Sequence, residues 1–346
     1  MRSLQYPRMI GRRIRLALRI VGYALGASIV LLAIALLVWR LTNPGPREAA
    51  RWLPVAEMPQ PRGEVASAIV GTRFIVAGGL YGIGRTSDAV HVYEVGRNEW
   101  TRTRSLPAPR HHAAAAGLGG HVYLTGGAPG ATDWTATDTL WRAQPGFPWT
   151  ALTPMPEGRQ GHAMVAHSGR LYVIGGVGET DRTLIYDPRA DRWTTGAPLP
   201  HGRDHLSAVA WEGEIWAIGG RSGGVTSRVD VYDPARDRWR SGPQLPRPMS
   251  AMAVGVLEDG LHVAGGEDPR FFLGGVIDQH FRLAPDERRW RPASRMILPI
   301  HGAGYAVHEG RLIVAGGATR EGILSTISWT PVTQAFRPQG FPRRLM

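Results

Sequence analysis

In this sequence of 346 residues, an arginine recurs at similar intervals. In most copies, an acidic or imidazole side chain follows two residues after the arginine. The recurring arginines are Arg62, Arg110, Arg159 and Arg203. The residues two positions later are Glu64, His112, Gly161 and His205, and His301 stands near the same position of a later copy. A guanidinium group binds a carboxylate through paired hydrogen bonds, and His or Glu can exchange protons near neutral pH. If the fold brings these positions together, they form a site for an anionic ligand such as a carboxylate-bearing sugar. The alternative is that the arginines only bond loop carbonyls.

Several histidines fall in the same segments, and imidazoles suit zinc or copper. They are His111, His112, His162, His201, His205 and His301. Their spacing follows the repeat described below, and no compact motif such as His-x-x-x-His occurs. We therefore expect no metal site. The sequence also lacks a Gly-rich phosphate loop and a Gly-x-Ser-x-Gly elbow, so we expect no cofactor and assign no catalytic residue.

The arginines are placed by a repeat of about 48 residues, marked by a pair of glycines that closes an alternating, β-branched segment. The pairs begin at Gly78, Gly126, Gly175, Gly219, Gly265 and Gly316. Two large side chains follow each pair, seven or eight residues apart. They are Tyr93 and Trp100, Trp141 and Trp149, Tyr186 and Trp193, Tyr232 and Trp239, Leu283 and Trp290, and Trp329 and Phe336. A segment rich in small residues precedes each glycine strand, as in the sequence HAAAAGL.

This pattern closely resembles the kelch family, whose motif is the double glycine followed by Tyr and Trp at this period. The resemblance covers the chain from Trp52 to about Phe336. It implies an all-β fold, a six-bladed propeller of four-stranded antiparallel blades around a central channel. The segments of small residues fit innermost strands, which crowd at the axis, and the aromatic residues fit the core between outer strands.

Two ways of closing the ring of blades are open. The segment around Trp52 can supply the outermost strand of the sixth blade, or the segment around Phe336 can complete that blade while Trp52 packs outside it. We expect the first, because it joins the two ends of the chain and removes a sheet edge.

In this architecture, the loops between second and third strands share a face with the connections between blades. The fifth-blade loop carries Arg270, Phe271 and Phe272, and the second-blade loop carries Trp134. These side chains are candidates for contact with a protein partner or a glycan, although they could equally fold over the rim of the propeller.

A second, separate element precedes the repeats. Residues 1–19 form a basic tail with six arginines and no acidic residue, and residues 20–39 are twenty residues without a charge. That length matches the roughly 30 Å hydrocarbon core of a bilayer, so it indicates a transmembrane signal anchor; a cleaved export signal is the alternative. Residues 40–50 would be a linker and residues 51–346 the propeller. The positive charge before the span predicts a cytoplasmic N-terminus and a propeller in the periplasm or outside the cell.

The net charge of +12 does not indicate nucleic-acid binding. All 40 basic residues are arginine, and six of them lie in the basic tail. The remaining 34 arginines are nearly balanced by 28 acidic residues spread along the chain. The favoured function is a monomeric, membrane-anchored module that binds a protein partner or an envelope glycan. The alternative is a sugar-active enzyme, because six-bladed kelch relatives include sialic-acid mutarotases. A metal-dependent enzyme is a variant of this alternative. The absence of Cys excludes the Cys–Tyr copper-radical cofactor of kelch-like galactose oxidases.

Overall fold

The computed structural model describes Tyr23 and residues 26–31, 51–130, 132–177, 181–268 and 275–338. The chain divides into two compact units, residues 1–45 and 46–346. In the first unit, the described residues are helical. Within the described residues, no helix is both long enough and apolar enough to cross a membrane. Most of the span expected at residues 20–39 lies outside the described part of the chain.

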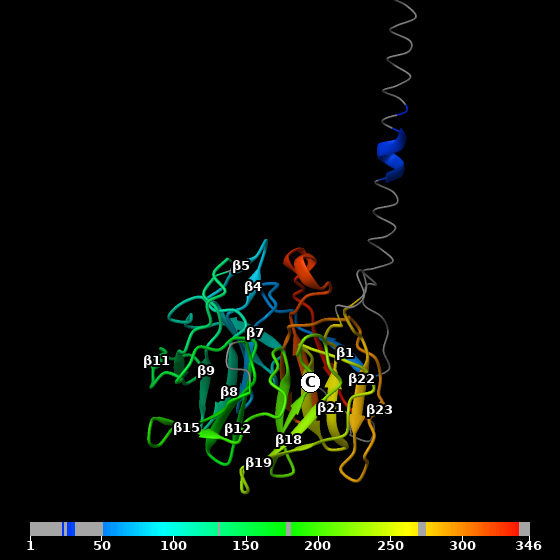
Figure 1. Ribbon diagram of the computed structural model, residues 1–346. Helices are drawn as coiled ribbons and strands as arrows, with labels where there is room; N and C mark the ends of the chain where they lie inside the picture. The colour runs from blue at the N-terminus through cyan, green and yellow to red at the C-terminus, as the bar shows by residue number, and fades with distance from the viewer. Residues whose placement is uncertain are drawn as a thin grey trace, which may run out of the picture. The chain divides into compact units, whose positions relative to one another are not determined.

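The second unit is a propeller of six four-stranded antiparallel sheets (Figure 1). Blade 1 contains β2 (Ala66–Val70), β3 (Arg73–Ala77), β6 (Val90–Glu94) and β7 (Glu99–Arg102). Blade 2 contains β8 (Ala114–Leu118), β9 (His121–Thr125), β10 (Leu140–Ala143) and β11 (Thr150–Ala151). Blade 3 contains β12 (Ala163–His167), β13 (Arg170–Ile174), β14 (Thr183–Asp187) and β15 (Arg192–Gly196).

The second half of the ring repeats this order. Blade 4 contains β16 (Ser207–Trp211), β17 (Glu214–Ile218), β18 (Val229–Asp233) and β19 (Arg238–Ser241). Blade 5 contains β20 (Ala253–Leu257), β21 (Gly260–Ala264), β22 (His280–Leu283) and β23 (Arg291–Pro292). Blade 6 contains β24 (Gly304–His308), β25 (Arg311–Ala315), β26 (Thr333–Phe336) and β1 (Trp52–Val55). A short hairpin, β4 (Leu80–Tyr81) and β5 (Arg85–Thr86), and a 3-10 helix, η1 (Gly322–Ile327), extend the loops of blades 1 and 6.

The innermost strands contact one another in chain order, and β24 returns to β2 to close the ring. Small side chains allow this approach. For example, a Cβ atom added at Gly117 of β8 would collide with the carbonyl oxygen of Ile69 in β2. The expectation that the segments of small residues form the innermost strands is therefore confirmed.

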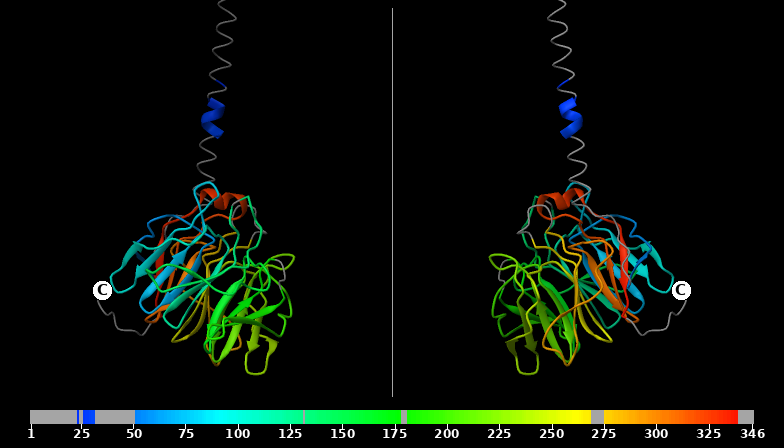
Figure 2. Two further views of the ribbon diagram at one scale, coloured as in Figure 1. Left: turned by 90° about the vertical axis from the view of Figure 1, so that its left-hand side faces the viewer. Right: turned by 90° about the vertical axis from the view of Figure 1, so that its right-hand side faces the viewer.

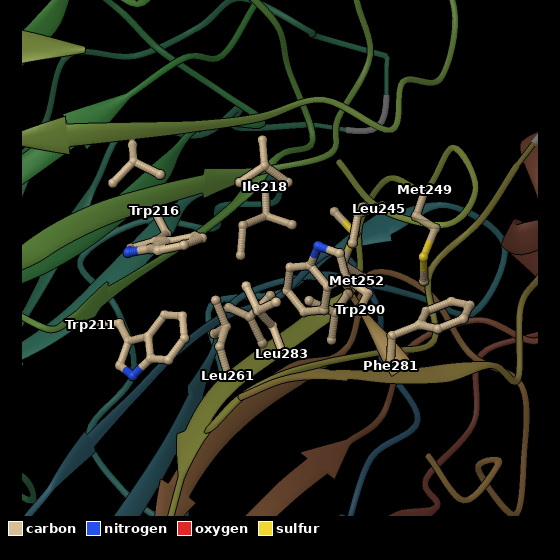
Figure 3. Packing of buried hydrophobic residues seen from close by; sticks show 14 of the residues in the cluster. Trp211, Trp216, Ile218, Leu245, Met249, Met252, Leu261, Phe281, Leu283 and Trp290 are labelled. Carbon is tan, nitrogen blue, oxygen red and sulfur yellow. The ribbon is translucent and has the colours of Figure 1, made fainter. Parts of the chain in front are cut away.

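Large apolar side chains fill the space between neighbouring blades. Figure 3 shows one such cluster, in which Trp211 and Trp216 of blade 4 pack with Leu261, Phe281 and other residues of blade 5. Several tryptophans in or next to the outer strands also donate their indole N–H to a carbonyl of the preceding blade. These bonds run from Trp100 to Ala56, from Trp193 to Thr153, from Trp239 to Ala197 and from Trp290 to Pro243, at 2.8–2.9 Å. The motif tryptophans thus join blades by hydrogen bonds as well as by packing.

The ring closes through the N-terminal strand of the propeller. β1 pairs with β26, and Trp52 stands opposite Phe336 in the register. The expected closure by Trp52 is confirmed, but the pairing of Trp329 with Phe336 is wrong. Phe336 lies in the third strand of blade 6, Trp52 takes the outer position, and Trp329 lies in the loop before β26. Because the loop of this blade is longer, the spacing of Trp329 and Phe336 matches the motif spacing one strand too early.

We expect Trp52→Ala to lower the free energy of unfolding by about 3–5 kcal/mol. The indole is 1% exposed, packs on Phe336 and donates to the Ser294 carbonyl in blade 5 at 2.9 Å. Denaturant unfolding of the purified chain measures the change. Leu53 lies on the same strand but is 60% exposed, so Leu53→Ala should stay within about 0.5 kcal/mol of the unchanged protein. Equal losses in the two variants would contradict this role of Trp52.

Candidate functional site at the channel mouth

Six residues, one from each connection into a blade, surround the mouth of the central channel in a closed ring of backbone hydrogen bonds. Each N–H donates to the carbonyl of the ring residue in the preceding blade, with N···O distances of 2.7–3.1 Å. The ring residues are Glu64, His112, Gly161, His205, Ala251 and Gly302. All six have a positive φ between 50° and 60°. This left-handed conformation is unfavourable for residues other than Gly, so the ring is held by the surrounding fold.

The paired glycines join the blades just outside this ring. The second glycine of each pair donates its N–H to a carbonyl in the connection that enters the following blade, as Gly79 does to Arg110 at 2.7 Å. A Cβ atom on Gly78 would collide with the same carbonyl oxygen, which explains why the first residue of the pair is also glycine. The sequence therefore repeats Gly-Gly because two backbones meet closely there.

The ring residues line a cavity of about 170 Å³ at the axis. The ligand-type atoms of Glu64, His112 and His205 all lie within 4.8 Å of one another. Gly161 and Gly302 leave room for these side chains, because a Cβ atom on Gly161 would press on His205 and one on Gly302 would collide with Glu64. The predicted convergence of Glu64, His112 and His205 is present in the geometry, although they come from blades 1, 2 and 4.

Further polar groups lie next to these three side chains. His112 Nδ1 lies 2.6 Å from His111 Nδ1, and His205 Nδ1 lies 2.5 Å from Asp204 Oδ1. His301 lies beside Glu64, with 4.0 Å between Nε2 and Oε1. Its other ring nitrogen is 3.5 Å from Glu267, which pairs with Arg221. Three of these neighbours occupy equivalent positions in their blades, directly before the ring residue: His111, Asp204 and His301. Each of them forms a β-bridge to the residue that follows the glycine pair of its own blade.

Burial and charge set the protonation of the site. Burial alone would raise the pKa of Glu64, but the nearby imidazoles, His112 foremost, and Arg221 hold it at about 2. Burial lowers the pKa of His112 to about 3 and that of His301 to about 4, and the facing Glu64 carboxylate offsets only part of this effect. At neutral pH, Glu64 is therefore ionised while His112 and His301 are neutral. The mouth presents one carboxylate and imidazoles with free lone pairs.

Trp134 lies beside this cluster. Its ring centroid is 4.8 Å from that of His111 and 5.1 Å from that of His112, and 51% of the residue remains exposed. The sequence predicts that Trp134 either contacts a protein partner or a glycan or folds over the rim of the propeller. In the structure, its ring packs against the channel-mouth imidazoles and still presents surface to solvent.

The recurring arginines are buried within the blades and do not line the cavity. Three bind the carbonyl of the first glycine in their own blade: Arg62 to Gly78, Arg159 to Gly175, and Arg203 to Gly219, at 2.6–2.7 Å. Arg203 also pairs with Asp230 at 2.7 Å. Arg110 bonds the Pro109 carbonyl, and its guanidinium carbon lies 4.8 Å from the centroid of Trp141. These contacts correspond to the alternative in which the arginines bond carbonyls.

Other sequence expectations have different outcomes. Arg270, Phe271 and Phe272 lie outside the described residues. His162 is buried and bonds Thr125 at 2.8 Å, whereas His201 is exposed. Asp204, Arg221 and Glu267 also lie at the site and are not among the residues predicted from the sequence. Their signal was their place in the repeat, directly before the ring residue or directly after the glycine pair.

Comparisons with known proteins agree with this architecture. A model described as "Kelch motif" matches residues 158–200 and 202–246. The chain is 30% identical over 301 residues to "Kelch-like protein terF" of Aspergillus terreus, covering 80% of this chain and 65% of that protein. It is 31% identical over 281 residues to "Kelch-like protein 35" of Mus musculus, covering 80% of this chain and 38% of that protein.

A solved structure, "Structure of YjhT", superposes with a TM-score of 0.67 at 18% identity, covering 82% of this chain and 97% of that one, and shows the fold alone. Together with the six blades, these matches support placing the chain among the kelch-repeat proteins. The chain spans less than two thirds of the length of these two curated relatives.

We expect the protein to lose stability as the pH falls below about 6.5, because several buried histidines stay neutral in the folded state. Burial lowers the pKa of His162 to about 3, whereas an unfolded histidine titrates near 6.5. The unfolded chain therefore binds more protons below pH 6.5, and the stabilisation present above that pH is lost progressively toward pH 3. Each such histidine contributes up to about 1.4 kcal/mol per pH unit.

Urea unfolding of the chain at several values between pH 4 and pH 8 measures this slope. His162→Gln should make the slope shallower by about one histidine's share. His201→Gln, at an exposed site, should leave it unchanged. A slope that is the same in all three proteins would contradict the account.

Proposed function

We propose that this chain is a monomeric, membrane-anchored kelch propeller that binds a protein partner outside the cytoplasm through one face. The observation that most supports partner binding is a set of large apolar side chains exposed on the loops between second and third strands. They are Ile83 (86% exposed), Trp134 (51%), Val177 (42%) and Ile327 (70%). We call this set the apolar loop face. Exposed apolar groups that share one side of a protein are typical of interaction sites.

The loops that carry these residues belong to blades 1, 2, 3 and 6, and the loops of blades 1 and 6 contain regular structure. Figure 1 and Figure 2 show η1, the orange-red helix, and the β4–β5 hairpin extending from the same side of the propeller. Trp329 ties them together, because its indole N–H donates to the Gly82 carbonyl at 3.0 Å. Such a scaffold presents Ile83 and Ile327 without the entropy cost of ordering a loose loop.

The chemistry of the apolar loop face favours a protein over a glycan. Three of its four residues are aliphatic, and aliphatic side chains offer a sugar no hydrogen bonds. A protein surface, by contrast, supplies apolar area that can be buried against them. An envelope glycan is the competing ligand.

Membrane attachment and location are proposed from the sequence. The uncharged segment at residues 20–39 is long enough to span a bilayer, and the arginine-rich residues 1–19 favour a cytoplasmic N-terminus. A reporter that works only outside the cytoplasm, fused after Met346, should be active. Activity of a reporter that works only in the cytoplasm would contradict this topology.

One observation favours a second function, an enzyme acting on an acidic sugar. Glu64 and His112 meet in a cavity, with 3.3 Å between Oε2 and Nε2, and could move protons on a bound sugar. Proton NMR of anomer exchange in a panel of sugar acids tests it. Faster exchange with the protein than with Glu64→Gln supports this function, and equal rates oppose it.

Site-directed photo-crosslinking tests the binding face in cells that naturally produce the chain. A photoreactive residue at Ile83 or Ile327 should give a discrete protein adduct. The same residue at Leu53, which is exposed on the outer strand β1, should give none. Trp134→Asp should reduce the adduct at Ile83 at least about tenfold, because it places a charge in the apolar face. A polysaccharide adduct would favour a glycan instead, and equal protein adducts from Leu53 would contradict the proposal.

A further inference from the structure

The three side chains at the channel mouth have the composition of a metal site. One carboxylate and two imidazoles form the protein ligand set of several catalytic zinc sites. The ligand atoms of Glu64, His112 and His205 lie within 4.8 Å of one another. In tetrahedral coordination, two ligand atoms that each lie about 2.1 Å from one ion are roughly 3.4 Å apart, so the most distant ligand atoms would each have to move by about 0.7 Å.

The hydrogen bonds around His112 leave a lone pair directed at Glu64. Gly130 O lies 3.0 Å from His111 Nε2 and can only accept, so neutral His111 carries its proton on Nε2. His111 Nδ1 is then an acceptor, and His112 Nδ1 must donate across the 2.6 Å that separates them. His112 Nε2 is left without a proton, 3.3 Å from Glu64 Oε2. Two acceptors therefore face each other, an arrangement that a cation between them would stabilise.

His205 is oriented in the same way. Its Nδ1 lies 2.5 Å from Asp204 Oδ1, so this nitrogen carries the proton and donates it to the carboxylate. In a neutral imidazole with its proton on Nδ1, Nε2 is the nitrogen that can bind a metal ion. A carboxylate that holds the distal N–H of an imidazole is the usual outer partner of a metal-binding histidine, and it fixes both the tautomer and the ring direction.

The backbone ring supplies a rigid frame with open space at the axis. Glu64, His112 and His205 share one backbone conformation, and each is hydrogen-bonded to its neighbours in the ring. The intervening Gly161 and the adjoining Gly302 have no side chain, and residues of the innermost strands also line the cavity of about 170 Å³. An ion held by three protein ligands would keep at least one position open toward this cavity for water or an oxygen ligand.

We propose that Glu64, His112 and His205 form a binding site for one divalent transition-metal ion, for which Zn²⁺ is the best match, on the axis of the propeller. The ligand atoms, their distances and the outer partners His111 and Asp204 carry this assignment. It replaces the expectation of no metal site, which rested on the absence of a compact sequence motif. The proposal is independent of partner binding at the apolar loop face.

Isothermal titration of the tag-free, full-length chain in detergent, first stripped with chelator, tests the site with Zn²⁺ and Co²⁺. One equivalent should bind per chain, and Co²⁺ should give visible absorption bands of a low-symmetry nitrogen–oxygen site. His112→Asn, His205→Asn and Glu64→Gln should each weaken Zn²⁺ binding at least about 100-fold. Asn is chosen because it tolerates the positive φ of the two histidines. Asp204→Asn should weaken binding about 10–100-fold through loss of the outer hydrogen bond.

The control is His308→Asn, which removes a histidine whose Nε2 lies 3.7 Å from Glu309 on the turn between β24 and β25. It should bind like the unchanged protein. Circular dichroism of every metal-free variant separates loss of the site from loss of the fold. The absence of one-equivalent binding in the unchanged chain would overturn the proposal. So would binding that persists in folded His112→Asn and His205→Asn.

Discussion

The closed ring of six backbone hydrogen bonds at the channel mouth is the constraint on which the rest of the propeller depends. Each ring residue donates to the preceding blade and accepts from the following one, so no blade can shift without breaking two of these bonds. The left-handed conformation that permits the ring is costly for Glu64, His112, His205 and Ala251. The same conformation places the six residues around one small cavity, so the element that closes the fold also builds the candidate site.

Two further sets of bonds join the blades at larger radius. Just outside the ring, the second glycine of each pair bonds the connection into the next blade. Within their own blades, three of the four recurring arginines bond the carbonyl of the first glycine. At the periphery, motif tyrosines and tryptophans and an Asn or Asp side chain form hydrogen bonds within and between blades. Asn98 and Asp237 each accept from a tyrosine hydroxyl of their own blade and from a backbone N–H of the preceding blade. The motif is therefore a set of contacts between blades that repeats because the geometry repeats.

Much of the fold could be predicted from the sequence, because its signals are local and repeated. The glycine pairs end second strands, the small residues mark innermost strands, and Trp52 identifies the closing strand. The site was harder to predict. The arginines had the expected spacing for a ligand-binding ring, but the spacing does not show which way a side chain points, and they turn into the blades.

The convergence of Glu64, His112 and His205 follows from their equivalent positions in the repeat, whereas its chemistry depends on neighbours that the motif does not mark. Asp204 and His111 set the tautomers, and the missing side chains of Gly161 and Gly302 set the space. Sequence spacing alone gives no metal signature here, because the three residues come from separate blades. Only closure of the ring brings them together.

Native-state hydrogen exchange, read residue by residue by NMR, tests the central claim most directly. If the ring holds the propeller together, the amides of its six residues exchange only when the whole propeller unfolds. Their opening free energies then agree with one another and with the free energy of unfolding. Rapid exchange at any of the six, or opening of one blade's ring amide independently of the others, would contradict the account.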